Sequence, residues 1–410
     1  LRGKGAVLIE GAKWCGKTST GEQQAKSVIY MSDSARRDQY RIFVDSTPKV
    51  ILDGETPRLI DEWQQTPKLW DMVRFEVDHR HGMGQFILTG SAVPAKLEEL
   101  HHTGTGRIAR LLMRPMSLWE SGDSNGTISL KELFTSPKSI AAENNNDLQR
   151  ISYLICRGGW PQAALLDDDE EIALDQAIDY YDAVVNADIQ RVDGVERNPE
   201  RVKRLMKSYA RSQGTQTSLA EIRNDMLAND QLALDEKTVS SYLDALRKIF
   251  VIEDMPAWNP NLRSKTSIRT TDTRYFVDPS IATAALSIGP NDLMNDLNTL
   301  GLFFETLCVR DLRVFAQALD GNVFHYRDKT GLECDTVVHL RNGDYGLIEI
   351  KIGGDKLIEE GAANLKKLSQ KIDTTKMKSP SFLMILTAVG SFAYRREDGV
   401  YVVPIGCLKD

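Results

Sequence analysis

The stretch AVLIEGAKWCGKTST, residues 6–20, decides the fold of the N-terminal part of the chain. An apolar run leads into a loop with the spacing G-x-x-x-x-G-K-[ST], filled by Gly11, Gly16, Lys17 and Thr18. Glycines at these positions let backbone N–H groups close around a phosphate, the lysine reaches the β- and γ-phosphates, and the hydroxyl binds magnesium. A helix-forming stretch follows, so strand, loop and helix occur in the order that a phosphate-binding loop requires.

Two acidic residues after a second apolar run, PRLIDEWQ, strengthen this interpretation. Asp61 and Glu62 end a short expected strand, where an aspartate would orient Mg²⁺ and a glutamate would activate water. A third expected strand, GQFILTGS, ends in Thr89 and Ser91, hydroxyls at the position of a γ-phosphate sensor. The predicted ATP- and magnesium-binding residues are Gly11, Gly16, Lys17, Thr18, Ser19, Asp61 and Ser91, with Thr18 and Asp61 on the metal.

Glu62 also favours ATP hydrolysis over phosphoryl transfer to a small molecule, because a small-molecule kinase must exclude water rather than activate it. The segment TGTGRIARLLMRP then offers three arginines that could stabilise γ-phosphate charge, from the same subunit or from a neighbour in a homo-oligomer. They are Arg107, Arg110 and Arg114. We take Arg107 as the catalytic candidate beside Lys17 and Glu62, although a solvated surface position is an equal alternative for each arginine.

Length and composition set the remaining bounds. The 410 residues predict two to four domains, and 41% hydrophobic with 27% charged residues is typical of a soluble globular protein. No apolar stretch is long enough to span a bilayer, no signal peptide is recognisable, and a cytoplasmic location is expected. The net charge of −7 argues against a nucleic-acid coat protein but leaves room for a local basic face.

The five cysteines are scattered, with neither zinc-binding nor disulfide spacing, as a reducing cytosol would favour. Cys156, Cys308 and Cys407 are expected to be small buried apolar residues. Cys15 lies inside the phosphate loop, so a thiol reagent is expected to block nucleotide binding there.

The middle of the chain divides into two parts. Residues 121–148 are polar and predict a surface excursion or a domain boundary, and apolar spacing of three and four then predicts helices up to about residue 192. From 198 to 275 the pattern is helix, helix, helix and ribbon, which is typical of a winged helix. Thr217 or Ser218 would cap the second helix with Glu221.

The winged-helix segment carries basic and hydroxyl side chains that could bind DNA phosphates and bases, although such modules also serve as protein–protein adaptors. The predicted contacts are Lys237, Ser240, Ser241, Arg247, Arg263, Lys265, Arg269 and Arg274.

Alternation predicts a hairpin in GLECDTVVHLRNGDYGLIEIKIGG. Residues directly opposite one another share a face, so the two apolar faces coincide only if the loop has an odd number of residues. A three-residue loop, Asn342–Asp344, with Gly343 or Asp344 in a left-handed conformation, is therefore predicted in place of a two-residue Asn342-Gly343 turn. It would set Asp335 opposite Lys351 and diagonal to Glu349.

Two carboxylates and a lysine on one face are a geometry for holding a divalent metal over a phosphodiester. Asp335 and Glu349 would bind the metal, Lys351 would position or activate water, and Glu305 from the preceding helix GLFFETLCVRDLRVF would complete the site. Glu333 is a rival for the role of Asp335, and an exposed alternating strand is the simpler alternative.

These segments together resemble bacterial and archaeal AAA-type P-loop ATPases with a C-terminal domain of unknown function, which itself resembles the restriction-endonuclease-like PD-(D/E)xK fold. The matching segments are GAKWCGKTST, LIDEWQ, FILTGSA, GRIARLLMRPMSLWE, RGGWPQAAL, SYARSQGTQTS, TVSSYLDALRKIFVIEDMPAWNP, GLFFETL and YRDKTGLECDTVVHL…GLIEIK. The resemblance implies ATP hydrolysis at Lys17, Thr18, Asp61 and Glu62, a winged-helix segment, and a nuclease-like site at Glu305, Asp335, Glu349 and Lys351. Cys334 departs from the hydrophobic residue expected between Glu333 and Asp335.

The predicted fold class is α/β, with a P-loop NTPase (AAA-type) core at 1–120, a helical lid or connector at 121–197, a winged-helix segment at 198–275 and a restriction-endonuclease-like domain at 276–410. The predicted function is that of a DNA-associated ATPase, with ATP and Mg²⁺ as cofactors, whose C-terminal domain binds or cleaves DNA. The alternative is an ATP-dependent switch or scaffold whose later domains bind protein or DNA without cleaving it.

Overall fold

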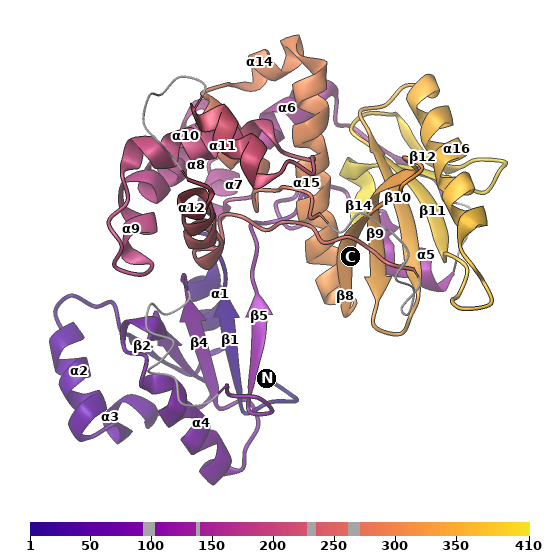
Figure 1. Cartoon of the computed structure of the whole chain (residues 1–410). Coiled ribbons are helices and arrows are strands. Elements are labelled where there is room, and N and C mark those ends of the chain that lie inside the picture. The colour runs from indigo at the N-terminus through magenta and orange to yellow at the C-terminus, as the bar shows by residue number, and fades with distance from the viewer. Residues whose placement is uncertain (93–102, 137–139, 228–234, 261–270) are drawn as a thin grey trace. The chain divides into compact units, whose positions relative to one another are not determined.

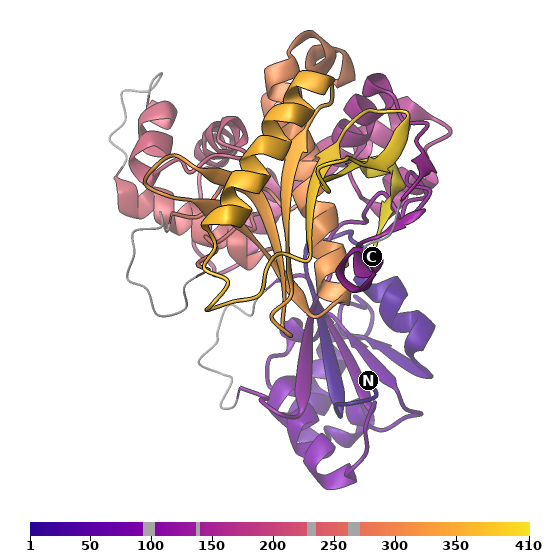
Figure 2. The same ribbon diagram turned by 90° about the vertical axis from the view of Figure 1, so that its right-hand side faces the viewer.

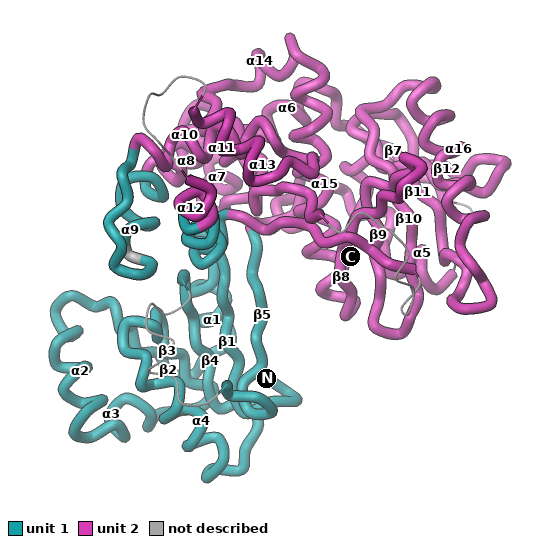
Figure 3. The backbone as a smooth tube through the Cα atoms, viewed as in Figure 1, with its two compact units in different colours: residues 1–114, 183–199, 241–251 teal, residues 115–182, 200–240, 252–410 magenta. Residues whose placement is uncertain are grey.

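The computed structural model describes the whole chain apart from residues 93–102, 137–139, 228–234 and 261–270 (Figure 1). Internal contacts divide it into two compact units (Figure 3). Unit 1 contains residues 1–114, 183–199 and 241–251, and unit 2 contains residues 115–182, 200–240 and 252–410. The four-domain boundaries drawn from the sequence stay a prediction. In the described part of the chain, no helix combines the length and the apolar character that a membrane crossing requires.

A sheet of parallel strands, in the order β2-β3-β4-β1-β5, forms the centre of unit 1. Its strands are β1 (Ala6–Glu10), β2 (Ser27–Tyr30), β3 (Arg58–Asp61), β4 (Phe86–Gly90) and β5 (Ile108–Leu112). The central runs RLID and FILTG are buried throughout, as a parallel sheet covered on both faces requires. Parallel strands end at a common edge, so the loop after β1 lies beside the ends of β3 and β4.

Helices complete unit 1. They are α1 (Lys17–Gln24), α2 (Arg37–Ser46), α3 (Lys49–Leu52), η1 (Trp63–Gln65), α4 (Leu69–Arg80), η3 (Val184–Asp188) and α9 (Ile189–Arg191). Trp63 and Trp70 anchor the apolar core on one side of the sheet, with ring centroids 5.1 Å apart, and Leu8, Ile60 and Leu88 pack in the same cluster.

A mixed sheet in the order β7-β12-β13-β11-β10-β9-β8 dominates unit 2. Its strands are β7 (Ala142–Glu143), β8 (Gly321–Arg327), β9 (Glu333–Leu340), β10 (Tyr345–Lys351), β11 (Phe382–Thr387), β12 (Phe392–Arg395) and β13 (Tyr401–Pro404). The helices α15 (Leu297–Ala318) and α16 (Asp355–Lys371) pack on the sheet from opposite sides (Figures 1 and 2). The apolar face of α16, with Leu365 and Leu368, meets Val337, Leu347 and Ile385 in one core.

The hairpin of β9 and β10 has the predicted parity but a shifted register. Thr336 lies opposite Ile348, even against even, and three residues separate Leu340 from Asp344, whose carbonyl oxygen accepts the Leu340 N–H at 2.8 Å. The prediction of an odd loop is thus confirmed, and Gly343 is left-handed with φ 87°. The predicted position of the loop was wrong by one residue, because apolar alternation fixes parity and not the exact step.

The polar segment 121–148, expected to be a surface excursion or boundary, is instead part of the C-terminal fold. It contributes β6 (Ile128–Ser129), α5 (Leu130–Thr135) and β7. β7 pairs with β12, and β6 pairs with β14 (Leu408–Lys409). Strands only two residues long carry no periodic signal, so composition alone suggested a connector.

Further helices complete unit 2, and those formed by residues 148–157, 279–286 and 290–295 contact α15. These further helices are α6 (Leu148–Arg157), α7 (Pro161–Leu165), α8 (Glu170–Ala183), α10 (Pro199–Arg211), α11 (Leu219–Leu227), α12 (Glu236–Lys248, whose last part falls in unit 1), α13 (Pro279–Leu286) and α14 (Pro290–Asn295), with η4 (Ile405–Cys407) near the C-terminal end. All five cysteines are buried and free, as expected for Cys156, Cys308 and Cys407.

The order α10, α11, α12 and a short ribbon follows the predicted pattern, with isolated antiparallel bridges at Ile252–Phe276 and Met255–Thr273. Ser218 forms the predicted capping box, since its hydroxyl accepts the Glu221 N–H at 3.2 Å while the Glu221 carboxylate accepts the Ser218 N–H at 2.7 Å. Whether this is a winged helix stays a prediction.

The residues of this segment that were predicted to contact DNA differ in their surroundings. Arg274 is buried, with a guanidinium nitrogen 2.9 Å from Asp254, so its prediction as a DNA contact was wrong. The positive charge of Arg274 is used in an ion pair within the protein. Arg263, Lys265 and Arg269 lie outside the described residues.

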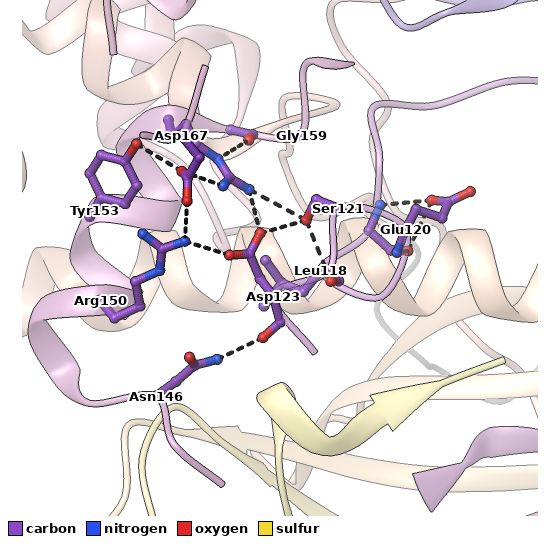
Figure 4. Close-up of polar contacts among 12 residues, drawn as sticks. Leu118, Glu120, Ser121, Asp123, Asn146, Arg150, Tyr153, Gly159 and Asp167 are labelled. Atoms are coloured by element: carbon purple, nitrogen blue, oxygen red, sulfur yellow. Dashed lines mark hydrogen bonds and ion pairs between the residues drawn. The ribbon is translucent and has the colours of Figure 1, made fainter. Parts of the chain in front are cut away.

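A buried ion network ties the start of unit 2 together (Figure 4). The Arg157 guanidinium, 2% exposed, donates to Asp123 at 2.6 Å and to Asp167 at 2.7 Å, and Arg150 donates to both carboxylates at 2.6 Å. Tyr153 donates its hydroxyl to Asp167 at 2.9 Å. Because both arginines bridge the same two aspartates, the network links Asp123 and Asp167 to the helix α6.

Candidate functional sites

The phosphate loop of unit 1 has the backbone that its glycines predict. Gly11 has φ 151°, and a Cβ there would lie 2.0 Å from the Met113 carbonyl oxygen, so only glycine fits. Gly16, with φ 96°, begins α1. Lys17 is 5% exposed and its ammonium donates to the Ala12 carbonyl oxygen at 2.5 Å, which holds the charge inside the loop.

Asp61 lies at the centre of the polar contacts beside this loop. Its Oδ1 accepts hydrogen bonds from the Thr18 hydroxyl at 2.7 Å and from the Thr89 hydroxyl at 2.6 Å. β3 and β4 end at the same edge of the sheet, and α1 starts there, so the register of the strands produces this meeting. The structure thus brings together Thr18 and Asp61, the two residues predicted to bind magnesium.

Glu62 is held just beyond β3 in a left-handed conformation, φ 55°. Its carboxylate accepts the Ser91 hydroxyl at 3.1 Å and the side-chain N–H of Gln64, and its own N–H donates to the Thr89 hydroxyl at 3.2 Å. Ser91, predicted to contact nucleotide, therefore also orients the predicted base. Gln64 was missed, although its position two residues after Glu62 was a signal that it could fold back on that carboxylate.

Ser19 and Arg107, two further predicted residues of the nucleotide site, lie in different places. Ser19 is exposed in the first turn of α1. Arg107 precedes β5, whose first residue pairs with Ala6 at the amino end of β1, and its guanidinium binds Asp78 at 2.8 Å. The predicted role of Arg107 at the γ-phosphate of its own chain was therefore wrong, because the phosphate loop leaves the opposite end of β1.

The other two arginines lie nearer the loop along the strand. Arg110 binds Glu10 at 3.0 Å, and Arg114 follows Met113, the residue whose carbonyl oxygen touches Gly11. Of the three arginines, Arg114 therefore lies nearest in sequence to the residue that contacts the phosphate loop. The sequence spacing could not distinguish the three, because only the pairing of β5 with β1 shows which end faces the loop.

Two further loop residues have unexpected surroundings. Lys13 forms an ion pair with the buried Asp188 of η3. Cys15 is fully buried, its Sγ lies 3.8 Å from the Lys17 ammonium, and burial raises the pKa of its thiol. A buried thiol with a raised pKa reacts slowly, which argues against the predicted block by thiol reagents.

In unit 2 the predicted carboxylates gather around Lys351. Its ammonium lies 3.0 Å from Asp335 and 2.7 Å from Glu349, and Asp335 also accepts the Ile350 N–H at 2.8 Å. Asp335 was predicted to lie opposite Lys351, but the strand register places it one pair beyond Thr336, opposite Glu349. The three side chains meet despite that shift, since the lysine is long enough to span it. We call Asp335, Glu349 and Lys351 the carboxylate–lysine cluster.

Burial sets the protonation of this cluster. Burial, followed by the nearby charge of Asp335, raises the pKa of Glu349 to about 8. The same two causes raise the pKa of Glu305 to about 8. Burial alone would lower the pKa of Lys351, but the charges of Asp335 and Glu349 outweigh it and raise that pKa. Such shifts concentrate at functional sites, although buried structural ion pairs also produce them.

Glu305 joins from α15 at the side of a cavity. The Tyr275 hydroxyl donates to its carboxylate, and both residues line the cavity together with Asp335. Within the described residues, no set of three or more His, Cys, Asp or Glu side chains has an arrangement that could hold a metal ion. The three carboxylates predicted to bind metal contact protein groups instead. Asp335 and Glu349 contact Lys351, and Glu305 accepts the Tyr275 hydroxyl.

Glu333 and Asp335, the two candidates for one role in the cluster, make different contacts. Glu333 is 54% exposed in its side chain and faces Arg327 at 3.5 Å, whereas Asp335 binds Lys351. Asn364 of α16 was missed as a neighbour of the cluster. Its amide donates to Glu349 at 2.7 Å, and only the packing of α16 on β10 could reveal it.

Comparisons with known proteins cover most of the chain in separate pieces. Residues 3–121 match the family model described as an AAA domain, and residues 148–292 and 300–408 match domains of unknown function, DUF8612 and DUF4143. The uncharacterized proteins Rv2008c of Mycobacterium tuberculosis and Mb2031c of Mycobacterium bovis are each 23% identical over 350 residues, which cover 84% of this chain and 70% of theirs.

Two solved structures are also similar. The Walker-type ATPase PABY2304 of Pyrococcus abyssi is 15% identical, with a TM-score of 0.41 and coverage of 68% of this chain and 91% of that one. The Aeropyrum pernix ORC1 protein, solved in complex with DNA, is 12% identical, with a TM-score of 0.21 and coverage of 69% and 86%. TM-scores this low do not define a shared arrangement of domains. Residues 3–121 are thus similar in sequence to an AAA domain, and the backbone of the phosphate loop within them agrees with that similarity.

Proposed function

We propose that this protein binds ATP with Mg²⁺ at the loop Gly11–Thr18 and hydrolyses it. The observation that carries the proposal is the contact of Thr18 and Thr89 with one carboxylate oxygen of Asp61, beside Lys17. Hydroxyl and carboxylate oxygens are the ligands that Mg²⁺ prefers, so the residues fit the ion. Bound Mg²⁺ would neutralise charge on the phosphates.

Glu62 is the proposed general base for the attacking water. Its carboxylate is anchored by Ser91 and Gln64, which leaves it oriented at the end of β3 rather than free to rotate. Lys17 would exchange the Ala12 carbonyl oxygen for phosphate oxygens when nucleotide binds. A kinase of small molecules is disfavoured, because a fixed carboxylate in this place would promote the loss of the phosphoryl group to water.

The test is ATP turnover by the full chain carrying Glu62→Gln or Lys17→Ala. Glu62→Gln should lower kcat by about a hundredfold or more while a fluorescent ATP analogue still binds. Lys17→Ala should abolish turnover and weaken binding. The exposed residues Glu55 and Lys26 provide the matched controls Glu55→Gln and Lys26→Ala, which should turn over ATP at the wild-type rate. Unchanged turnover in Glu62→Gln would remove the proposed base.

A second proposal concerns the carboxylate–lysine cluster, where the observation is the approach of Lys351 to both Asp335 and Glu349. We propose that it binds a divalent cation and cleaves phosphodiesters of DNA. The two carboxylates of Asp335 and Glu349 would hold Mg²⁺ or Mn²⁺ together with oxygens of the substrate phosphate, and the bound cation would polarise that phosphate. Lys351 would hold a water in line for attack, and Glu305 would complete the polar surround.

The test is cleavage of single- and double-stranded DNA with Mg²⁺ or Mn²⁺, with and without ATP. Asp335→Asn and Lys351→Met should each slow cleavage by about a hundredfold. The exposed residues Asp168 and Lys356 give the controls Asp168→Asn and Lys356→Met. Intact DNA in every wild-type reaction would favour the alternative, a switch that binds DNA or protein without cutting. DNA binding that does not weaken with salt would contradict a basic winged-helix face.

A further inference from the structure

A cavity of about 240 Å³ opens beside the carboxylate–lysine cluster. One wall comes from residues 214–216, which follow α10, together with Tyr275. The other wall carries Glu305, His325 and Asp335. The two walls belong to the segments that match different models of unknown function, 148–292 and 300–408. The cavity therefore makes one site from two regions that sequence comparison separates.

The first wall is fixed against Glu305. Gly214 has φ 68°, and a Cβ there would lie 3.2 to 3.3 Å from the Glu305 carboxylate, so glycine allows the backbone this close approach. The Gly214 N–H donates to the Arg274 carbonyl oxygen at 3.0 Å, and the Arg274 N–H donates to the Thr215 carbonyl oxygen at 2.9 Å. These two bonds hold the segment against the backbone of Arg274.

The side chain of Gln216 is oriented by His325. The His325 Nε2 lies 3.0 Å from the Thr271 carbonyl oxygen, which can only accept, so the ring proton belongs on Nε2. Nδ1 then accepts, and the Gln216 Nε2 donates to it at 3.2 Å. Burial keeps the ring neutral by lowering the pKa of His325 to about 4. This chain of bonds fixes which end of the Gln216 amide is the acceptor.

We propose that Gly214–Gln216 is the substrate-positioning wall of the carboxylate–lysine cluster, and that the cavity receives one nucleotide of a nucleic-acid strand, hydrogen-bonded by Gln216. The inference rests on the proposed phosphodiester chemistry, and it adds the region that aligns the strand. An oriented amide has a donor and an acceptor for a base edge, which a hydrophobic wall would lack. Asp335 lies in the cavity wall, and a divalent cation bound there would hold the incoming phosphate beside the cluster.

The first experiment measures binding of a short fluorescein-labelled single-stranded DNA to the full chain in Ca²⁺. Gln216→Leu keeps the size of the side chain and removes the amide, so affinity should fall about tenfold, the effect of one lost hydrogen bond. Gln162→Leu, on the exposed surface of α7, is the matched control and should bind as the wild type does. Removal of Ca²⁺ with a chelator should abolish binding to the wild type.

The second experiment measures steady-state cleavage with Mg²⁺ or Mn²⁺. Gln216→Leu should raise KM about tenfold and leave kcat within about twofold, because it acts on the strand and not on the reacting atoms. Gly214→Ala should lose cleavage and keep ATP turnover. Gly399→Ala is its control, since Gly399 is also left-handed, φ 88°, and a Cβ there meets only the Arg395 guanidinium at 3.7 Å.

The outcomes separate the two proposals. If the wild type binds DNA in Ca²⁺ and Gln216→Leu weakens binding but neither protein cleaves, nucleotide binding in the cavity is supported and the nuclease proposal fails. Wild-type cleavage with an unchanged KM in Gln216→Leu would contradict nucleotide binding by Gln216 in the cavity and leave the nuclease proposal intact. If the wild type neither binds nor cleaves DNA, both are overturned.

Discussion

Lys351 carries one positive charge between two carboxylates, and this charge opposes the rise in the pKa of Glu349 and Glu305 that burial causes. Asp335 keeps contacts with the ammonium and with the Ile350 N–H, so its negative charge is well compensated. Glu349 and Glu305 then face both burial and a neighbouring negative charge, which raises the pKa of each. Burial thus sets the charge state of a group drawn from a hairpin and a helix, and Lys351 limits the shift.

The buried His325 makes stability depend on pH. Its pKa is lowered from 6.5 to about 4, mainly by burial, with a smaller effect of Arg327, so the unfolded chain binds more protons between these values. The stabilising effect of the neutral ring is complete above pH 6.5 and is lost as pH falls toward 4. His325→Gln should therefore flatten that dependence. Urea unfolding should give a wild-type minus variant difference that shrinks by about 1 kcal/mol from pH 6.5 to pH 5.5.

A difference that stays constant across this range would mean that His325 is not the titrating group. His79, which is exposed, gives the control variant His79→Gln, whose stability should follow the wild type at every pH.

Arg157 offers a second test at the level of single residues. Arg157→Ala would leave the buried side chain of Asp123 and the partly exposed Asp167 with Arg150 as their shared arginine, so unfolding free energy should fall by about 2–3 kcal/mol. Denaturant unfolding of the full chain, followed by circular dichroism, measures this loss. Arg36→Ala removes a solvent-exposed arginine and should leave the midpoint unchanged. A loss no larger than that of the control would mean that the network is not cooperative.

At the scale of elements, local patterns were most reliable where neighbouring residues decide the structure. The capping box of Ser218 and Glu221 and the odd hairpin loop both depend on residues a few positions apart. Alternation gave the parity of the hairpin but could not supply its exact register. Cys334 and Val337 are three positions apart on β9, so strict alternation would place them on opposite faces, yet both belong to one core cluster.

The start of α11 can be tested by separating the two caps that the sequence left open. Ser218→Ala should destabilise unit 2 by about 1 kcal/mol, because the Glu221 N–H loses its acceptor. Thr217→Val keeps the side-chain shape and removes only a hydroxyl that bonds Thr215, so its effect should be smaller. Thermal unfolding of the two variants side by side makes the comparison. An equal or larger loss in Thr217→Val would reassign the cap.

At the scale of the whole molecule, the sequence predicted sites made of contiguous motifs and missed their distant neighbours. Gly11–Thr18 and Asp61-Glu62 were predictable, because strand and loop order places them at one sheet edge. Arg107 was wrong because only the pairing of β5 shows which end of the sheet it joins. Tyr275 reaches Glu305 from another part of the chain, and no periodicity connects the two residues.

The pairing of early and late segments in unit 2 has a consequence for synthesis on the ribosome. Ser124 donates its hydroxyl to the Leu408 carbonyl oxygen, 284 residues further along. The strands of the parallel sheet in unit 1 have all been made by residue 112, whereas β6 and β7 must wait for partners that emerge last. At about 5–20 residues per second the delay is on the order of tens of seconds. During that time the nascent chain carries unpaired edges that a neighbouring nascent chain on the same messenger could capture.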